Sequence, residues 1–309
     1  MAGGTKIIQH RIRSISNTKK ITKAMKMVSA AKMRKATGNV LATRPYSNLA
    51  WDIIGNLSRI KEDWTHPLLT FREKKTGKSL VILITSDKGL CGGFNAQMFR
   101  ETKHFISRFN PPSVVGGRRG GGYSLDFIVL GKKGESFAHR EKLGVVATFE
   151  NLTNNPKFVN IKPIAKMAMD GFVNGVYDEV FTAYTDYIST LVQKPRVRQL
   201  LPVIKDKDLG EIGAKLTADS LQPAAEYLFE PEKSELLEMM LPKIVETQIY
   251  QAILESVASE QSARMVAMQN ATDAANEMVE DLKFTYNKIR QAGITREISE
   301  ISAGKAAIE

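Results

Sequence analysis

The sequence predicts an α/β protein in which two long terminal helices form an antiparallel coiled coil and the central segment forms a small open sheet. Three observations support this prediction. Both ends carry apolar residues at helical spacing, the centre carries short apolar runs, and the excess of basic charge lies at one end. We expect coiled-coil helices at 1–75 and 231–309, and an α/β domain at 76–230 with a flexible Gly- and Arg-rich loop at 110–124.

The N-terminal segment is expected to form one helix from Thr5 to Ile60, because it is rich in Lys, Arg, Ala and aliphatic residues and contains few helix breakers. A bend is expected near Pro45. Apolar residues three and four positions apart predict a contact stripe along this helix. The expected stripe consists of Ile8, Ile12, Ile15, Ile21, Met25, Val28 and Lys32.

Charge is distributed unevenly along the chain. Lys and Arg number 44 against 33 Asp and Glu, which gives a net charge of +11. No acidic residue precedes Asp52, and the basic residues before it account for the whole excess. The N-terminal segment is therefore predicted to face an acidic partner or surface.

The C-terminal segment carries the stronger coiled-coil pattern. A helix from Leu241 to Gln291 would be about 75 Å long and would need a partner along its length. Its expected seam is unusual because small, flexible and polar side chains replace the Leu and Ile of a stable dimeric zipper. An ordinary helical core with a few polar interruptions is the alternative. The expected seam is Gln261, Arg264, Met268, Ala271, Ala275, Met278, Leu282, Thr285 and Ile289.

The centre changes to strand-like and helical runs in alternation, which indicates a Rossmann-like open α/β domain. Two runs are continuously apolar and two alternate, so we expect buried strands in the first pair and partly exposed strands in the second. The expected strands are Leu80–Thr85, Leu125–Leu130, Asp178–Tyr187 and Leu191–Leu201, and the expected helices are Ala96–Phe109 and Ile161–Val173.

Few residues suggest catalysis. The glycine-rich turn Ser86–Asn95 follows an apolar strand, a position where many sheets bind phosphate, but it fits neither common phosphate-loop spacing. A structural turn is therefore expected, with a nucleotide site as the alternative. Cys91 is expected to be an inert thiol rather than a nucleophile. The four histidines lack metal-ligand spacing. No catalytic, cofactor or metal site is expected.

Several classes of protein are disfavoured. No apolar run approaches the roughly 20 residues of a membrane-spanning helix. The N-terminus lacks the apolar core of a secretory signal, and an Arg- and Ser-rich presequence is also missing. A single cysteine, Cys91, excludes an internal disulfide framework and fits a reducing cytoplasm.

Two functional classes remain on pattern alone. The basic N-terminal segment could bind nucleic-acid phosphates, but aromatic side chains for base stacking are scarce within it. The other class is a protein interaction shaft. The C-terminal heptad pattern favours the shaft, because a nucleic-acid-binding arm does not require it.

Three motifs resemble the gamma subunits of F-type ATP synthases. They are Asn17–Val28, the turn Ser86–Asn95 and Tyr286–Ile298, and they occur in the same order over nearly the whole length. The resemblance implies a non-catalytic rotor of the central stalk. Its terminal helices would lie inside a hexamer of alternating alpha and beta subunits, and its α/β domain would lie near the epsilon subunit and the membrane c-ring. No nucleic-acid partner is implied.

The resemblance also implies particular contacts with the beta subunit. Arg290 and Gln291 correspond to polar contacts with a loop of the open beta subunit, and Thr295 and Glu297 lie beside them. Met25 corresponds to a position near acidic beta residues. Arg290 could form a charge-assisted bond to a beta carboxylate that is made and broken once per step.

A second group of residues is implied to touch the c-ring. These residues are Tyr227, Phe229 and Glu230, although the two aromatic residues could equally belong to a core strand. Through the c-ring the protein is expected to be a peripheral membrane protein on the cytoplasmic face of a bacterial inner membrane, with a mature organellar form as the alternative.

Overall fold

The structure is a computed structural model that describes residues 2–57, 66–71, 76–109, 124–154, 156–203 and 233–306. The chain divides into two compact units. The first unit combines Met1–Ala30 with Arg264–Glu309, and the second is Ala31–Ala263. Within the described ranges, none of the helices combines the length and the apolar character needed to span a bilayer.

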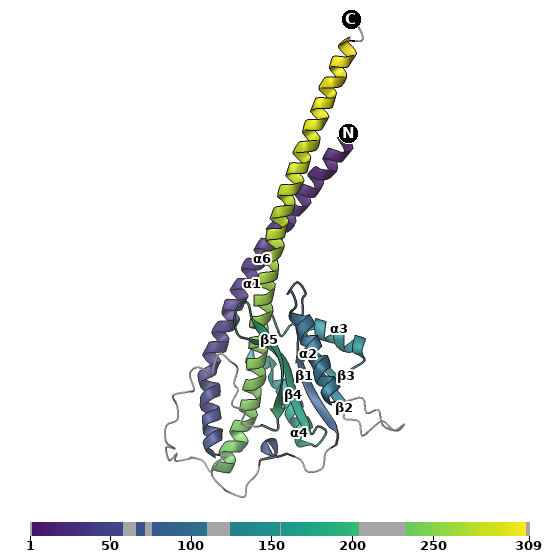
Figure 1. The fold of residues 1–309 in the computed structure, drawn as a ribbon. Helices are drawn as coiled ribbons and strands as arrows, with labels where there is room; N and C mark the ends of the chain where they lie inside the picture. The colour runs from purple at the N-terminus through teal and green to yellow at the C-terminus, as the bar shows by residue number, and fades with distance from the viewer. Residues whose placement is uncertain are drawn as a thin grey trace, which may run out of the picture. The chain divides into compact units, whose positions relative to one another are not determined.

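The two terminal helices are the longest elements (Figure 1). Helix α1 runs from Ala2 to Leu57 and contains Pro45, and helix α6 runs from Lys233 to Ala306 and contains Pro242. Helix α6 therefore extends beyond the expected range Leu241–Gln291 at both ends. At the N-terminal end, packing around the buried Leu241 can outweigh the cost of Pro242, whereas the mostly exposed residues after Gln291 continue the helix although Gly293 has a low helix propensity.

The second unit contains a five-stranded sheet in the order β3-β2-β1-β4-β5. The first four strands in this order are mutually parallel, and β5 is antiparallel to β4. The predicted fold class is confirmed, with terminal helices and an open α/β sheet. The strands are β1 (Lys78–Ile84), β2 (Ser124–Leu130), β3 (Gly144–Phe149), β4 (Glu179–Tyr187) and β5 (Gln193–Leu201).

The 3-10 turn η1 (Pro67–Leu69) precedes the first strand. The parallel strands are connected by α2 (Phe94–Phe109), by α3 (Lys132–Glu141), and by the 3-10 turn η2 (Phe158–Asn160) with α4 (Lys162–Val173). Helix α3 and strand β3 were not predicted from the sequence. Strand β3 is an edge strand with mostly exposed residues, and α3 is largely polar, so neither produces a strong apolar pattern.

Both faces of the sheet are covered by apolar side chains. In β1, Leu80, Ile82 and Ile84 face one core, which includes residues of α4 and α6. The alternate residues Val81 and Leu83 face a second core formed with α2 and α3. This alternation follows from the two-residue period of a strand, and it explains why β1 is apolar throughout.

Candidate partner surfaces

The first unit is an antiparallel pair of helical segments from α1 and α6. The amide Nε2 of Gln9 donates to the Tyr286 hydroxyl at 2.8 Å, and the Thr22 and Thr272 hydroxyls lie 2.8 Å apart. Moving forward along α1 therefore corresponds to moving backward along α6, as predicted for an antiparallel coiled coil.

Buried and half-buried residues of this unit define its seam. On both helices they alternate in steps of four and three over most of their length, which is the heptad pattern. Along α1 the seam is Ile8, Ile12, Ile15, Lys19, Thr22, Lys26 and Ser29, and along α6 it is Arg264, Met268, Thr272, Ala275, Val279, Leu282, Tyr286, Ile289 and Gly293.

The seam differs from the sequence prediction in its phase. On α1 the predicted stripe was wrong at three of its last four positions, because Ile21 and Val28 are 60% and 56% exposed and Lys32 is also exposed, whereas Met25 is half-buried. The buried residues are their neighbours Thr22 and Ser29.

A similar shift occurs on α6. Arg264, Met268 and Ala275 are buried as predicted, but Met278 and Thr285 are exposed. The seam continues instead through Val279 and Tyr286, each one position further along the helix. The general prediction of small and polar seam residues is confirmed.

Threonine 22 and threonine 272 place a buried polar contact in this seam. Both side chains are less than a tenth exposed, and the Thr272 hydroxyl also donates to the Met268 carbonyl at 2.7 Å. The Thr22 hydroxyl lies 3.0 Å from the Lys19 carbonyl. A buried hydroxyl that loses its partner retains the cost of desolvation, so the two residues should depend on each other.

We expect Thr22→Val to lower the free energy of unfolding of the helix pair by about 1–2 kcal/mol. Adding Thr272→Val should then cost less than the sum of the single changes, because both polar groups are removed together. Thermal unfolding followed by circular dichroism measures this cycle. Thr18→Val is the control, since Thr18 is exposed on the same helix and donates to the Ser14 carbonyl. Additive effects of the two changes would contradict the pairing.

Several large apolar side chains of this unit are exposed. On α1, Ile21, Met27 and Val28 are each more than half exposed. On α6, Phe284 is 74% exposed and Ile301 is 73% exposed. Ile21 and Val28 lie seven residues apart and so share one face of α1, and contiguous exposed apolar surface can mark a protein interaction site. In the middle of α1 the pairing thus buries Thr22 and Ser29 and leaves Ile21 and Val28 exposed.

The predicted beta-subunit contacts lie on the surface of the first unit. Arg290, Gln291, Thr295 and Glu297 are all exposed on α6, and Met25 is half-buried on α1. The Thr295 hydroxyl donates to the Gln291 carbonyl at 3.0 Å within the helix. The predicted c-ring contacts Tyr227, Phe229 and Glu230 lie outside the described residues.

The turn Ser86–Asn95 lies at the carboxyl end of β1, beside the point where the strand order reverses, which is where open α/β sheets commonly bind ligands. Its side chains are used within the fold. The Asn95 side chain accepts a hydrogen bond from the Ser86 amide at 3.2 Å and donates to the Ser86 hydroxyl at 2.7 Å. These bonds close the turn on itself.

Asp87, within this turn, connects the turn to the start of α3 and to the segment that follows β3. Its carboxylate accepts hydrogen bonds from the amides of Lys132 and Asn151 and from the Thr153 hydroxyl, the last at 2.9 Å. The Lys132 amide belongs to the first turn of α3, so the Asp87 carboxylate takes the place that an anion would take at that helix N-terminus. The turn itself leads into α2 and bonds its own side chains, which favours the structural turn over the nucleotide site.

The other candidate reactive side chains, Cys91 and His66, form hydrogen bonds within the fold. Cys91 is buried, and its sulfur accepts a hydrogen bond from the Asn95 amide group at 3.3 Å. His66 is buried at the start of η1, where its Nδ1 accepts a hydrogen bond from the Leu68 amide at 3.1 Å. Burial lowers the pKa of His66, which favours the neutral form needed for this bond. Across the described ranges, His, Cys, Asp and Glu side chains form no group that could hold a metal ion.

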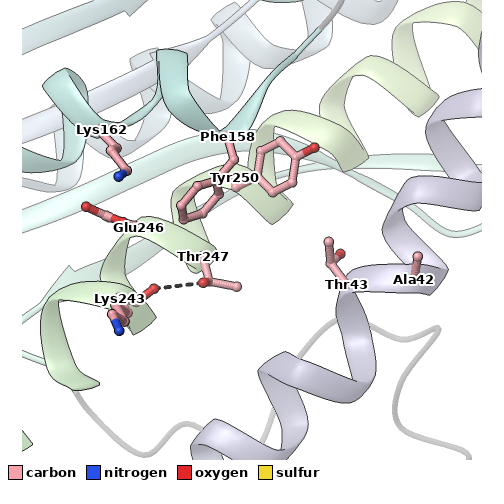
Figure 2. Close-up of a pocket in the computed structure, with 8 residues that line it drawn as sticks. All are labelled: Ala42, Thr43, Phe158, Lys162, Lys243, Glu246, Thr247 and Tyr250. Carbon is pink, nitrogen blue, oxygen red and sulfur yellow. Dashed lines mark hydrogen bonds between the residues drawn. The ribbon is translucent and has the colours of Figure 1, made fainter. Parts of the chain in front are cut away.

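A cavity of about 550 Å³ opens in the second unit between α1, η2, α4 and α6 (Figure 2). The rings of Phe158 and Tyr250 meet edge to face there, with centroids 5.6 Å apart. Burial raises the pKa of Tyr250. The lining combines aromatic surface with charges of both signs. It comprises Ala42, Thr43, Phe158, Lys162, Lys243, Glu246, Thr247 and Tyr250.

Comparison with known proteins agrees with this architecture. A family model described as ATP synthase matches residues 4–308. The ATP synthase gamma chain of Herpetosiphon aurantiacus is 42% identical, in an alignment that covers 97% of each chain. The gamma chain of Coxiella burnetii is 40% identical over 98% of each chain, and that of Legionella pneumophila is 37% identical over 99% of each chain.

Solved structures show the same fold. A chain from the rotor of the Euglena gracilis mitochondrial ATP synthase aligns with a TM-score of 0.60 at 19% identity, covering 95% of this chain and 100% of that chain. A chain from the OSCP/F1/c-ring part of the same enzyme gives a TM-score of 0.64 at 20% identity, covering 100% and 95%.

The terminal helices pair with each other and expose apolar side chains. The sheet edge at which open α/β sheets commonly bind ligands is filled by the chain's own side chains. These two features are typical of a protein that acts through its helices by binding other proteins. The matches over nearly the full length place it more closely: this chain belongs to the family of ATP synthase gamma chains.

Proposed function

We propose that this chain is the central-stalk rotor subunit of a proton-translocating F-type ATP synthase. It would couple rotation of the c-ring to conformational changes in the catalytic beta subunits. The observation that carries this proposal is the 37–42% identity to ATP synthase gamma chains over at least 97% of the chain. The exposed apolar faces of the paired helices support it, because a rotor needs outward surfaces that partners can contact.

The proposed partners are the alpha and beta subunits around the helix pair, and the epsilon subunit and c-ring near the α/β domain. The chain would have no catalytic site of its own, and ATP would be made or hydrolysed in the beta subunits. Its membrane association would be peripheral, through the c-ring, on the cytoplasmic face of the bacterial inner membrane. No observation on the described residues favours the alternative of a nucleic-acid-binding protein.

The coupling has a simple physical basis. A ligand or subunit can shift the equilibrium of a neighbour only if it interacts differently with the neighbour's conformational states. The first unit presents unlike faces, since Ile21 and Val28 expose aliphatic surface on α1 while Lys20 and Lys23 expose positive charge. Three similar catalytic subunits that meet different faces would therefore be held in different conformations.

The function is tested by reconstituting the purified chain with alpha, beta and epsilon subunits and the membrane sector in sealed vesicles. ATP addition should acidify the vesicle interior only when this chain is present. Hydrolysis without any acidification, or failure of the chain to join the complex, would refute the rotor function. Binding to nucleic acid in place of the complex would support the alternative.

We also expect Arg290 to contribute a contact that matters during the cycle. Arg290→Ala should reduce the rate of ATP-driven acidification by about tenfold, the effect of losing one charge-assisted hydrogen bond of roughly 1.5 kcal/mol. Arg296→Ala is the matched control, since the Arg296 side chain is engaged with Glu300 at 2.7 Å on the same helix. Equal effects of the two changes would argue against a special role for Arg290.

A further inference from the structure

Helix α6 crosses β4 in the second unit through a layer of buried polar side chains. Glu255, Ser256, Ser259 and Ser262 are each at most 3% exposed, although they lie in the middle of a long helix. The facing strand contributes Asp186, which is 1% exposed. Polar groups are expensive to bury unless they are hydrogen-bonded, so this layer requires an explanation beyond packing.

Two serine hydroxyls in the layer bind backbone carbonyls of the β4–β5 hairpin. The Ser259 hydroxyl donates to the Thr185 carbonyl at 3.2 Å, and the Ser262 hydroxyl donates to the Thr190 carbonyl at 2.7 Å. The two serines are three residues apart, and they therefore lie on the same face of α6. Their two acceptors lie at the end of β4 and in the turn that follows it.

The acceptors are groups that the sheet itself leaves available. The register between β1 and β4 ends at Leu83 and Ala183, so Thr185 lies beyond the last residue of β4 that pairs with β1. Thr190 lies in the hairpin turn between β4 and β5, where its carbonyl also accepts a bond from the Gln193 side chain at 2.9 Å. The Ser259 acceptor thus lies where β4 pairs only with β5, opposite Pro195, and the Ser262 acceptor lies in the turn beyond the paired residues.

The hairpin is stiffened close to these contacts. Asp186 and Arg196, on β4 and β5, form an ion pair with a distance of 3.2 Å between Oδ2 and Nε. Asp186 is almost fully buried, and such pairs are strongly destabilised when one partner is removed. Burial and the nearby Glu255 carboxylate raise the pKa of Tyr184, which therefore stays neutral in the same layer. The ion pair therefore ties β4 to β5 directly beside the serine contacts.

We propose that Ser259 and Ser262 form a joint that transmits torque between the α/β domain and the C-terminal helix. This inference rests on the proposed rotor function and adds the residues that hold the shaft to its base. Apolar contacts are non-directional and allow a helix to slide or turn about its axis. Two directional hydrogen bonds to fixed carbonyls oppose both motions, and α6 continues without interruption from these serines to Ala306.

Ser256 provides a matched control on the same helix. Its side chain is 2% exposed, and its hydroxyl has no hydrogen-bond partner. Replacing it with alanine removes the same atom from an equally buried site without breaking a bond. Differences between the variants therefore report the hydrogen bonds and not the loss of a buried hydroxyl as such.

The test uses the reconstituted complex in vesicles and two measurements. Hydrogen exchange of the peptide spanning Tyr187–Gln193 should be about 30-fold faster in the Ser259→Ala, Ser262→Ala double variant, the effect of losing two hydrogen bonds of ordinary strength. In the same variant, the ratio of acidification to ATP hydrolysis should fall as the opposing proton gradient grows. Ser256→Ala should match the wild type in both measurements.

Each outcome bears on the proposal. Unchanged hydrogen exchange in the double variant would overturn the proposed joint. Faster hydrogen exchange, with an unchanged ratio of acidification to ATP hydrolysis as the opposing proton gradient grows, would overturn its role in transmitting torque. Parallel loss of assembly and hydrolysis at a constant ratio would show a merely structural role and would also overturn it. If the wild-type chain itself supports no acidification, the rotor function fails, which is distinguishable from failure of the joint.

Discussion

Replacing Gly131 with alanine is expected to lower the free energy of unfolding of the α/β domain by about 3 kcal/mol or more. Gly131 precedes α3 and has a φ of 94° and a ψ of 142°, a conformation that side chains other than hydrogen rarely tolerate. A Cβ atom there would lie 2.5 Å from the Thr85 carbonyl oxygen and 3.0 Å from the Ser86 carbonyl carbon. Both obstacles are backbone atoms, so they cannot move aside cheaply.

The consequence should extend to the turn Ser86–Asn95. The Thr85 hydroxyl donates to the Leu130 carbonyl at 2.8 Å and accepts a hydrogen bond from the Gly134 amide at 2.9 Å. Displacing Thr85 would break this connection between β1, β2 and α3. Chemical denaturation of the purified chain, followed by circular dichroism, measures the loss of stability.

Gly38→Ala serves as the opposite case. A Cβ at Gly38 would meet no atom within 4 Å, and the residue lies inside α1. Alanine there should stabilise the chain by about 0.5–1 kcal/mol, because it has the higher helix propensity. If both alanine variants unfold at the same denaturant concentration, the steric argument for Gly131 is wrong.

Replacing Met25 with lysine is expected to impair coupling in the assembled enzyme while ATP hydrolysis continues. Met25 is half-buried on α1 and has basic residues, Lys23 and Lys26, close to it in sequence. Its proposed neighbours are acidic residues of the beta subunit, past which an uncharged thioether can move. A lysine would form a new ion pair of about 2 kcal/mol in the interface and slow the release of that contact by roughly 30-fold.

The measurement compares ATP-driven acidification with ATP hydrolysis in the same vesicles. Met25→Leu is the control, since it has similar volume and no charge and should retain normal coupling. Added salt should partly restore coupling to Met25→Lys, because screening weakens an accessible ion pair. Normal coupling in the lysine variant would contradict the proposed position of Met25 against acidic beta residues.

The predicted strands show what an apolar pattern can and cannot establish. The runs around β1 and β2 are apolar throughout because both of their faces are covered, and this is visible without coordinates. Strand β3 is mostly exposed at an edge, so its short Val- and Thr-containing run carried too little signal. The strand order and the reversal of β5 depend on contacts between residues far apart in sequence.

The helix seam shows a different limit. Hydrophobicity alone placed Ile21 and Val28 inside, yet the structure buries Thr22 and Ser29 and leaves the aliphatic residues exposed. Small side chains let two helices approach closely, and larger ones are then available for other proteins. A sequence pattern that assumes one interface cannot separate the residues of two interfaces on one helix.

The residues predicted to contact the beta subunit can be located in the structure, but their contacts are proposals. The exposure of Arg290, Gln291, Thr295 and Glu297 is compatible with contacts to a beta subunit, and those contacts remain proposals, as does the role of Met25. The hydroxyls of Ser259 and Ser262 were missed because two serines in a helix carry no recognisable motif. Only the backbone carbonyls that lie opposite them give them a role.

By itself, the sequence determined that two long helices flank an α/β domain, that basic charge is concentrated on the first helix, and that three motifs mark a gamma chain. These properties depend on composition, on local periodicity and on short runs of residues. The tertiary structure decided which face of each helix is buried, how the strands are ordered, and which buried hydroxyls join α6 to the sheet. Those features arise from complementarity between distant segments, which local periodicity does not encode.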